Sequence, residues 1–195
     1  MEETSIAHRI GAFFLDMIET IVIALSIFLV IYLFLMQPHQ VSGLSMFPTY
    51  HDKEYLLTDK VSYKFGNPKR GDVVVFHAPP AANCPAGTGC DFIKRVIGLP
   101  GETLEIKDHA WYINGKQLPE PYIPPENILN DGAFTEGRAV TLGPDEYLVI
   151  GDNRPHSSDG RVWGPITKEE IVGRVFFRYF PFNRAGLTAP VTYPF

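Results

Sequence analysis

The sequence predicts a mainly β fold, with one N-terminal transmembrane helix in front of an antiparallel all-β domain. Three observations predict this. Residues 20–36 form an apolar run without a charge, whereas beyond Pro38 the apolar residues fall into short runs of strand length. The third observation is that 17 glycines and 17 prolines punctuate the chain and leave little room for further long helices.

The apolar run is long enough for a membrane helix. As a helix it would be roughly 25 Å long, close to the ~30 Å hydrocarbon core of a bilayer. Its extension to residues 13–37 brings in Asp16 and Glu19, which we expect at the level of the lipid headgroups. The sequence therefore predicts a short cytoplasmic tail at 1–12, a transmembrane helix at 13–37 and a β domain at 38–195.

A cleaved signal peptide is the alternative interpretation of the apolar run. Such peptides begin with a basic segment and carry an apolar stretch of only ~7–15 residues. Here the N-terminus carries Glu2, Glu3 and a lone Arg9, and the apolar run is longer, which favours an uncleaved anchor. Arg9 before the helix and Lys53 after it are nearly balanced, so charge does not set the orientation of the anchor.

Net charge and cysteines bear on the surroundings of the β domain. The net charge of −5 argues against nucleic acid as a partner. Cys84 and Cys90 enclose a short loop, and the alternatives for them are two free thiols, an incomplete zinc site or a disulfide. A disulfide fits best if the domain lies outside the cytosol, and we expect an extracytoplasmic domain.

The β domain is predicted from its turns and apolar runs. The Asn114-Gly115 pair between two apolar runs predicts a hairpin over residues 109–118. Proline-rich or turn-rich stretches at 77–91 and 119–139 are expected to be loops or inserted excursions. Strands are expected within residues 71–79, 91–108 (two strands around a Leu-Pro-Gly turn), 145–153 and 169–182.

The stretch VSGLSMFPTY, residues 41–50, places Ser45 in a glycine-flanked and proline-stiffened turn. A serine hydroxyl there is a candidate nucleophile, but it needs a base to accept its proton. Among the histidines, His156 is the one candidate base, because its segment is dense in polar groups. No metal-binding spacing such as H-E-x-x-H and no glycine-rich phosphate loop occurs, so we expect neither a metal nor a cofactor.

Lys94, in the strand-like run DFIKRVIG, is the other candidate base. Alternation places it on the same face as Phe92 and Val96, which would hold its ammonium against apolar neighbours. A free lysine has a pKa of ~10.4, and burial lowers this by up to ~3–5 units, which makes the amine a usable base near neutrality. A drop of about three units costs roughly 4 kcal/mol. On this pattern alone, a lysine whose ammonium stays in water is the simpler interpretation.

The segment GDNRPHSSDGR, residues 151–161, gathers acids, arginines, serines and an asparagine after a strand. It is either a polar surface loop or a scaffold that orients an amine. Together with SGLSMFPT, GDVVVF and DFIKRVIGLPGE, in this order and spacing, it resembles the type I signal peptidases. Each motif alone is weak, but four in order are highly specific, and the match spans residues 41–180.

The resemblance implies that Ser45 is the nucleophile and Lys94 the general base. Some family members carry a serine two residues before the nucleophile, where its hydroxyl helps to bind the oxyanion. Gly43 stands there in this chain, with Ser42 one step further away, so the second oxyanion donor beside the Ser45 N–H is open. One such donor is worth roughly 10²–10³ in rate. Phe92 stands where tyrosine is common, which removes no catalytic group.

The last motif carries the supporting residues that the resemblance implies. Ser157 corresponds to a serine whose hydroxyl orients the lysine amine. Asp159 corresponds to an acid that supports the segment through an ion pair with Arg95 or Arg161. Residues 151–154 correspond to the family's GDNR and are expected to be structural.

The implied protein is a cofactor-free serine–lysine endopeptidase, anchored in the cell membrane by a single span. It would remove signal peptides from secretory preproteins after small residues such as Ala at positions −1 and −3, with the lipid bilayer as its surroundings, and we expect a monomer. Its fold would be of the kind shared with self-cleaving LexA-type repressors. A soluble repressor disagrees with the membrane helix and the acidic charge. A non-catalytic anchored domain would leave Ser45 and Lys94 in matching motifs unexplained.

Overall fold

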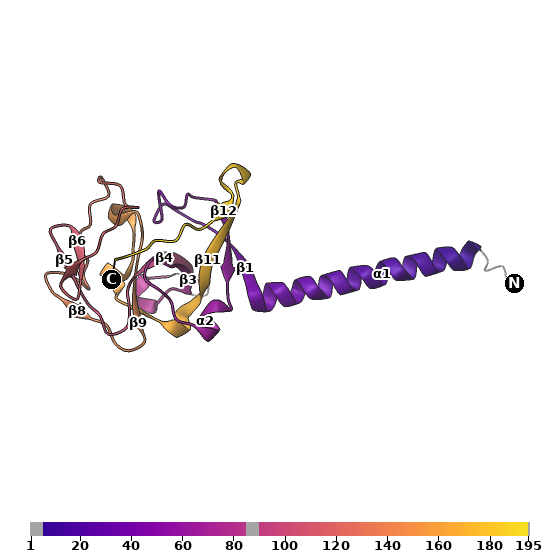
Figure 1. Ribbon diagram of the computed structural model, residues 1–195, viewed down its shortest axis with the longest axis horizontal. Coiled ribbons are helices and arrows are strands. Elements are labelled where there is room, and N and C mark those ends of the chain that lie inside the picture. The colour runs from indigo at the N-terminus through magenta and orange to yellow at the C-terminus, as the bar shows by residue number, and fades with distance from the viewer. Residues whose placement is uncertain (1–5, 85–89, 195) are drawn as a thin grey trace.

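A long helix projects away from a β domain (Figure 1). The structure is a computed structural model that describes residues 6–84 and 90–194. Helix α1 (Ile6–Val30) contains a stretch long and apolar enough to cross a membrane, and none of that stretch is buried inside the protein. The tail expected at 1–12 falls partly on residues 1–5, which lie outside the described residues.

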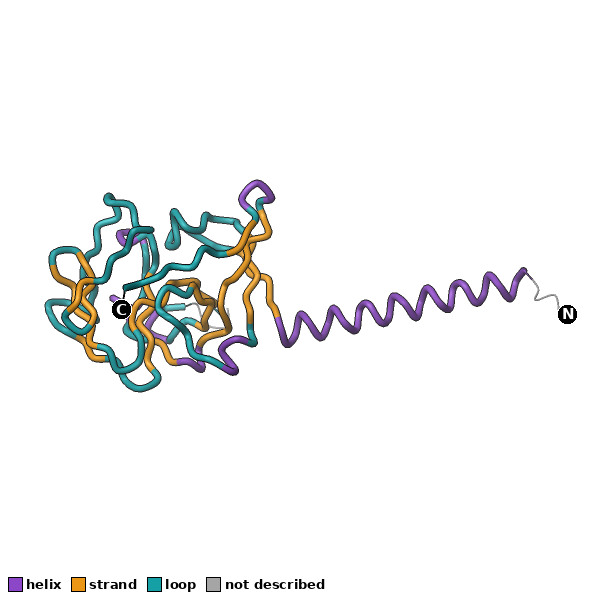
Figure 2. The backbone as a smooth tube through the Cα atoms, viewed as in Figure 1, coloured by secondary structure: helices purple, strands orange, loops and turns teal. Residues whose placement is uncertain are grey.

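The helix gives way to a strand without a linker. A π-helical turn, Ile31–Leu35, ends the helix, and strand β1 (Met36–Gln40) follows at once (Figure 2). The expected boundary at residue 37 therefore falls inside β1. Pro38 accounts for this, because proline lacks the N–H of a helical hydrogen bond and disfavours helical geometry at the preceding residue. The Lys60 N–H donates to the carbonyl of the last helical residue at 3.0 Å, which ties the helix end to the domain.

The larger sheet has eight strands, and its strand pairs are antiparallel. The predicted antiparallel β domain is thus confirmed. Strand β12 (Gly186–Leu187) pairs with β11 only and lies outside the row that the other strands form. In that row the strands lie side by side in the order β1, β2 (Tyr55–Asp59), β11 (Ile171–Phe180), β3 (Val73–His77), β4 (Asp91–Gly98), β9 (Glu146–Ile150) and β10 (Ile166–Thr167).

A smaller sheet of four strands lies at the end of the domain away from the helix (Figure 1). Asn114 and Gly115 connect its strands β6 and β7 with φ angles of 50° and 79°, so the predicted hairpin is confirmed. Two one-turn helices lie in connections of the larger sheet: α2 (Ser62–Phe65) in the connection from β2 to β3, and α3 (Gly160–Trp163) in the connection from β9 to β10. The order of the smaller sheet is β7 (Lys116–Gln117), β6 (Ala110–Ile113), β5 (Thr103–Lys107) and β8 (Val140–Thr141).

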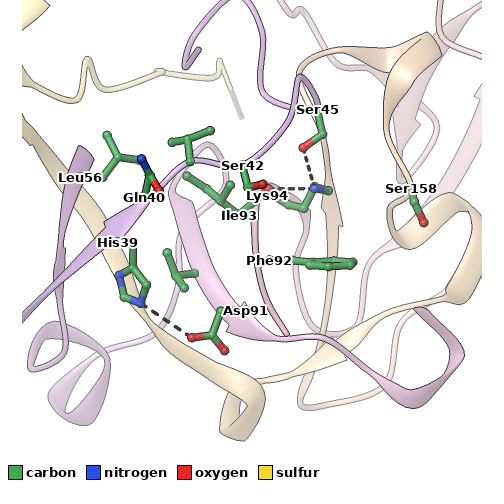
Figure 3. A pocket seen from close by; sticks show the side chains of 12 residues that line it. His39, Gln40, Ser42, Ser45, Leu56, Asp91, Phe92, Ile93, Lys94 and Ser158 are labelled. Carbon is green, nitrogen blue, oxygen red and sulfur yellow. Dashed lines mark hydrogen bonds and ion pairs between the residues drawn. The ribbon is translucent and has the colours of Figure 1, made fainter. Parts of the chain in front are cut away.

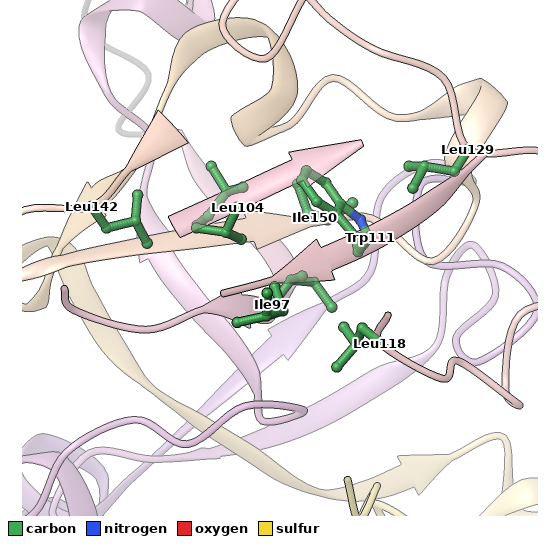
Figure 4. Packing of buried hydrophobic residues seen from close by; sticks show 9 residues of the cluster. Ile97, Leu104, Trp111, Leu118, Leu129, Leu142 and Ile150 are labelled. Atoms are coloured by element: carbon green, nitrogen blue, oxygen red, sulfur yellow. The ribbon is translucent and has the colours of Figure 1, made fainter. Parts of the chain in front are cut away.

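An apolar cluster joins the two sheets (Figure 4). Ile97 of β4 and Ile150 of β9 pack with Leu104 of β5 and Trp111 of β6, and all four are buried. Burying a large apolar side chain stabilises the fold by about 1.5–3 kcal/mol. The strand that carries Lys94 is therefore anchored in the core at its C-terminal half.

The strands expected within residues 71–79, 91–108, 145–153 and 169–182 are present as β3, β4 and β5, β9 and β11. The sequence does not predict β1 and β2. β1 contains a proline, which is tolerated because β1 lies at the edge of its sheet. Residues 118–139 hold turns but no helix or strand in this described part of the chain.

Cys84 and Cys90 are not joined by a disulfide, which was the alternative that an extracytoplasmic domain favours. Both carry thiols in the structure, and residues 85–89 between them lie outside the described part of the chain. A side-chain hydrogen bond with Cys90 raises the pKa of the Cys84 thiol to about 11.

Candidate active site

Ser45 lies in the turn that connects β1 to β2. Met46 and Tyr50 of this turn are buried and pack with Leu56 of β2 in one apolar cluster, which holds the turn against the sheet. The Ser45 carbonyl accepts a hydrogen bond from the Asn153 N–H at 3.0 Å. The candidate nucleophile therefore sits on a turn that is fixed from two sides.

Lys94 faces Ser45 from strand β4. Its nitrogen Nζ lies 2.9 Å from Ser45 Oγ and donates to the Ile93 carbonyl at 3.0 Å (Figure 3). The residue is only 4% exposed, and the Phe92 ring centre lies 5.2 Å from Nζ. The alternation of β4 thus brings the lysine against the aromatic neighbour that the sequence predicted.

Burial changes the acid–base character of this lysine. It lowers the pKa of Lys94 to about 8, because the charged form loses its hydration, although the carboxylates of Asp159 and Asp152 raise it in part. A neutral amine within hydrogen-bond reach of a serine hydroxyl is the geometry that proton abstraction requires. The alternative base, His156, is exposed, and no hydrogen bond joins its ring to Ser45 among the described residues.

Asp159 organises the segment that follows β9. Its carboxylate accepts a hydrogen bond from the Gly151 N–H at 3.0 Å and pairs with the Arg161 guanidinium at 2.8 Å. Of the two partners expected for Asp159, Arg161 is therefore the right one. Arg95 pairs instead with Asp152 at 2.6 Å. Sequence alone left this choice open, because both arginines lie in matched motifs.

The Arg95–Asp152 pair is almost completely buried, with side chains 2% and 0% exposed. Arg95 donates through Nε and Nη2 to the two oxygens of Asp152, at 2.8 and 2.6 Å, and through Nη1 to the Gly71 carbonyl at 2.9 Å. The Thr49 hydroxyl donates to the same carboxylate at 2.5 Å. This network joins the turn that carries Ser45 to β4 and to the segment after β9.

Ser157 lies against Gly151. A Cβ at Gly151 would come within 2.1 Å of the Ser157 hydroxyl oxygen, so a glycine is required for this close approach. That oxygen is buried and has no hydrogen-bond partner among the described residues. The hydrogen bond from Ser157 to the Lys94 amine that the resemblance implies is thus not formed in this structure.

Gly43 adopts a φ angle of 90°, a region that favours glycine. Its N–H donates to the Asp52 carboxylate at 2.8 Å and is therefore engaged. The Ser45 N–H has no acceptor among the described residues. The Ser45 amide is the donor that remains open to an oxyanion.

Ser45 and Lys94 open onto a pocket of about 280 Å³. Its walls include buried apolar side chains such as Leu56, and His39 and Asp91 line it on the side away from Ser45 (Figure 3). Within residues 6–84 and 90–194 no cluster of His, Cys, Asp and Glu side chains could hold a metal ion. The pocket therefore combines a serine–lysine pair with an apolar cleft.

The structure adds residues that sequence reasoning did not place at the site. Asn153 also donates through its side chain to the Leu44 carbonyl at 3.0 Å, so it holds the turn before Ser45 as well as Ser45 itself. His39 and Asp91 line the pocket although they lie in different strands. The match of residues 151–154 to the family's GDNR marks Asn153 as structural but does not predict its contact with the turn that carries Ser45.

Comparison with known proteins places the chain in a family. The family model described as "Signal peptidase, peptidase S26" matches residues 14–180. Signal peptidase IB of Staphylococcus aureus (strain COL) is 35% identical over 181 residues, which cover 87% of this chain and 91% of that protein. Probable signal peptidase I-1 of Synechocystis sp. is 36% identical over 184 residues, which cover 93% of this chain and 90% of that protein.

A solved structure is also similar. The crystal structure of a signal peptidase I from Enterococcus faecalis V583 is 32% identical in sequence, with a TM-score of 0.44 and coverage of 56% of this chain and 97% of that chain. Membership follows from the family model and the sequence relatives, which match most of the chain. The chain therefore belongs to the signal peptidase family, peptidase S26, and is a serine endopeptidase.

Proposed function

We propose that this protein removes signal peptides from exported preproteins with Ser45 as nucleophile and Lys94 as general base. Membership of the family establishes signal-peptide removal by a serine protease. The roles of Ser45 and Lys94 are supported by the 2.9 Å contact between Lys94 Nζ and Ser45 Oγ, made by a lysine whose pKa is lowered to about 8. A base with such a pKa suits proton transfer near neutral pH.

The proposed reaction runs in two halves. Neutral Lys94 accepts the Ser45 proton as Oγ attacks the scissile carbonyl, and its ammonium then returns the proton to the leaving amine of the mature protein. This leaves the signal peptide as an ester on Ser45. A water molecule then gives a proton to Lys94 and attacks the ester, and that proton returns to Oγ as the signal peptide leaves with a new carboxylate.

The supporting residues are proposed to fix this pair. The Ser45 N–H would bind the oxyanion, which agrees with its lack of an acceptor in the described structure. Ser157 is proposed to turn its hydroxyl to the Lys94 amine when substrate binds, and the absence of another partner for that hydroxyl supports this. Asp159 and Arg95 would act through the ion pairs that hold the motifs together.

Small side chains are proposed at positions −1 and −3 of the substrate. Side chains two residues apart in an extended chain point to the same face, so both would enter one pocket. The pocket of about 280 Å³ beside Ser45 supports two small groups such as Ala methyls rather than two large ones.

We propose that α1 is a single membrane span and that the β domain lies on the extracytoplasmic side of the cell membrane, as a monomer. The exposed apolar surface of α1 supports a lipid environment. A shared bilayer confines enzyme and preprotein to one surface and raises their effective concentration. The net charge of −5 supports the expectation that nucleic acid is not a partner.

Cleavage of a model preprotein by the purified full-length protein in detergent tests the proposal. N-terminal sequencing of the product is expected to place the cut directly after Ala-x-Ala. A matched preprotein with a bulky Phe at position −1 is expected to remain intact, because the ring would take up space that the −3 side chain needs in the same pocket. An inert protein, or cleavage that ignores position −1, would contradict the proposed function.

The pH profile of kcat/KM gives a second prediction. Protonated Lys94 cannot accept a proton, so kcat/KM is expected to rise about tenfold per pH unit below about 8 and to level off above it. Cleavage of one peptide in a series of buffers at constant ionic strength measures this. An inflection near the pKa of an ordinary histidine, ~6.5, would instead indicate a histidine base.

A further inference from the structure

The side of the pocket away from Ser45 carries a charged group that the proposed mechanism does not use. Asp91 begins strand β4, and Lys94 follows on the same strand roughly 10 Å further along. Among the described residues that line the pocket, Asp91 is the only acidic one. Its side chain is 28% exposed, so a bound side chain can reach the carboxylate.

Histidines from two neighbouring elements face this carboxylate. The His77 Nδ1–H donates to Asp91 Oδ1 at 2.7 Å. His39 Nε2 lies 3.8 Å from Asp91 Oδ2, too far for a direct hydrogen bond (Figure 3). The other ring nitrogen of His39 lies 3.0 Å from the Thr58 hydroxyl, whereas its Nε2 is buried without a hydrogen-bond partner in the described structure. Oδ1 of Asp91 is thus engaged, whereas Oδ2 has no hydrogen-bond partner among the described residues.

The charge of this site follows from its neighbours. Burial lowers the pKa of His39 below its usual value, although the Asp91 carboxylate raises it in part, so the ring is largely neutral at pH 7 and does not cancel the charge of Asp91. The positive charge of Lys60 also favours the neutral ring of His39. The side chain of His77, by contrast, lies largely in water and is 68% exposed. The far side of the pocket therefore presents a carboxylate acceptor.

We infer that Asp91, held between His39 and His77, makes the pocket prefer a hydroxyl side chain, Thr or Ser, over an aliphatic one of equal size at position −3 of the substrate. This rests on the proposed function. The scissile carbonyl must lie against Ser45, so the −1 side chain occupies that end of the pocket. In an extended substrate the −3 side chain lies on the same face roughly 7 Å further on, toward Asp91.

A hydroxyl suits this end of the pocket because it both donates and accepts. It donates to Asp91 Oδ2, and its lone pairs can accept from an N–H at His39 Nε2 once a movement of the ring exposes that buried atom. A valine methyl in the same place strips water from the carboxylate and returns no hydrogen bond. A carboxylate that a bound hydroxyl satisfies and a bound methyl only desolvates therefore discriminates between two side chains of the same shape.

Threonine and valine have nearly the same shape, so peptides that differ only in these residues at position −3 test the inference. The parent protein is expected to cleave the Thr peptide with kcat/KM about fivefold to tenfold above the Val peptide. In Asp91→Ala this ratio is expected to fall to about one or below, and in His39→Phe to fall part of the way. Asp145→Ala, at an exposed acid outside this pocket, is the matched control and keeps the parent ratio.

A third peptide with Ala at position −3 reports the activity of each variant independently of the hydroxyl. A parent ratio of one or less, or an unchanged ratio in Asp91→Ala, overturns the inference while cleavage itself persists. If Asp91→Ala does not fold, Asp91→Asn keeps the shape without the charge and is expected to lower the ratio about threefold. A parent protein that cleaves none of the three peptides overturns the proposed function as well, so the two failures are distinguishable.

Discussion

Lys94→Met is expected to lower kcat/KM at least about 10³-fold while leaving the protein no less stable than the parent. The thioether side chain fills the same buried space but cannot accept a proton. In the parent the pKa of Lys94 is about 8 instead of 10.5, so burying its charge at pH 7 costs about 3 kcal/mol. This exceeds the loss of the lysine's hydrogen bonds to Ser45 and to the Ile93 carbonyl, each about 1 kcal/mol.

The pH dependence of this stability difference has a definite sign. Below about pH 8 Lys94 is protonated in both the folded and the unfolded protein, so the cost of burial is fully present. As the pH rises toward 10.5 the folded protein holds a neutral amine and the cost disappears. The advantage of the methionine variant is therefore expected to be largest near pH 7 and to shrink by about pH 10.

Thermal unfolding of the full-length protein in detergent at both pH values, together with preprotein cleavage, measures these effects. Ser45→Ala is expected to be equally inactive but to show no gain in stability. Lys107→Met is the matched control, since Lys107 is exposed and pairs with Glu105, and it is expected to change neither quantity. Retention of more than about a tenth of the activity by Lys94→Met would mean that another group accepts the proton.

Asp152→Ala is expected to lower the free energy of unfolding by about 3–5 kcal/mol. Asp152 is the bidentate partner of Arg95, and its removal leaves a guanidinium buried without a counter-charge. Thr49 loses the acceptor of its hydroxyl at the same time. Because this network holds the turn that carries Ser45, kcat is expected to fall more than KM rises.

Denaturant unfolding of the variants measures the stability change. The double variant Arg95→Met/Asp152→Leu is expected to lose less than the sum of the two single variants, because neither charge remains buried. Glu105→Ala, which removes an exposed ion pair with Lys107, is the control and is expected to cost less than about 1 kcal/mol. If Asp152→Ala lowered the free energy of unfolding by no more than this control does, the buried pair would not hold the Ser45 turn, β4 and the segment after β9 together.

Much of the fold is predictable because its signals are local. The Asn114-Gly115 turn and the apolar run of β3 need no information from distant parts of the chain. β1 and β2 escape prediction because β1 carries Pro38 and polar residues, and its pairing with β2 is decided by the tertiary register. The end of the helix depends on the same pairing.

The site is predictable to the extent that motifs define it. Ser45 and Lys94 follow from their motifs, whereas the pattern of β4 alone favours a lysine with its ammonium in water. Whether the Lys94 ammonium is buried or lies in water depends on the neighbouring strands, which bury it, and the pattern of a single strand cannot predict this. The same holds for the choice of Asp152 as the partner of Arg95, because the two come together only through the pairing of β4 with β9.

Only a π-helical segment of five residues separates α1 from β1, so the proposed membrane span would limit where a preprotein can be cut. The chain from Leu35 to Ser45 would span at most roughly 35 Å if fully extended, and β1 is held in the sheet rather than hanging as a loose tether. With α1 across a bilayer, the nucleophile stays at one height above the lipid. We therefore expect cleavage close to the membrane surface, and we expect an Ala-x-Ala sequence deep within the mature part of a passenger protein to remain uncut.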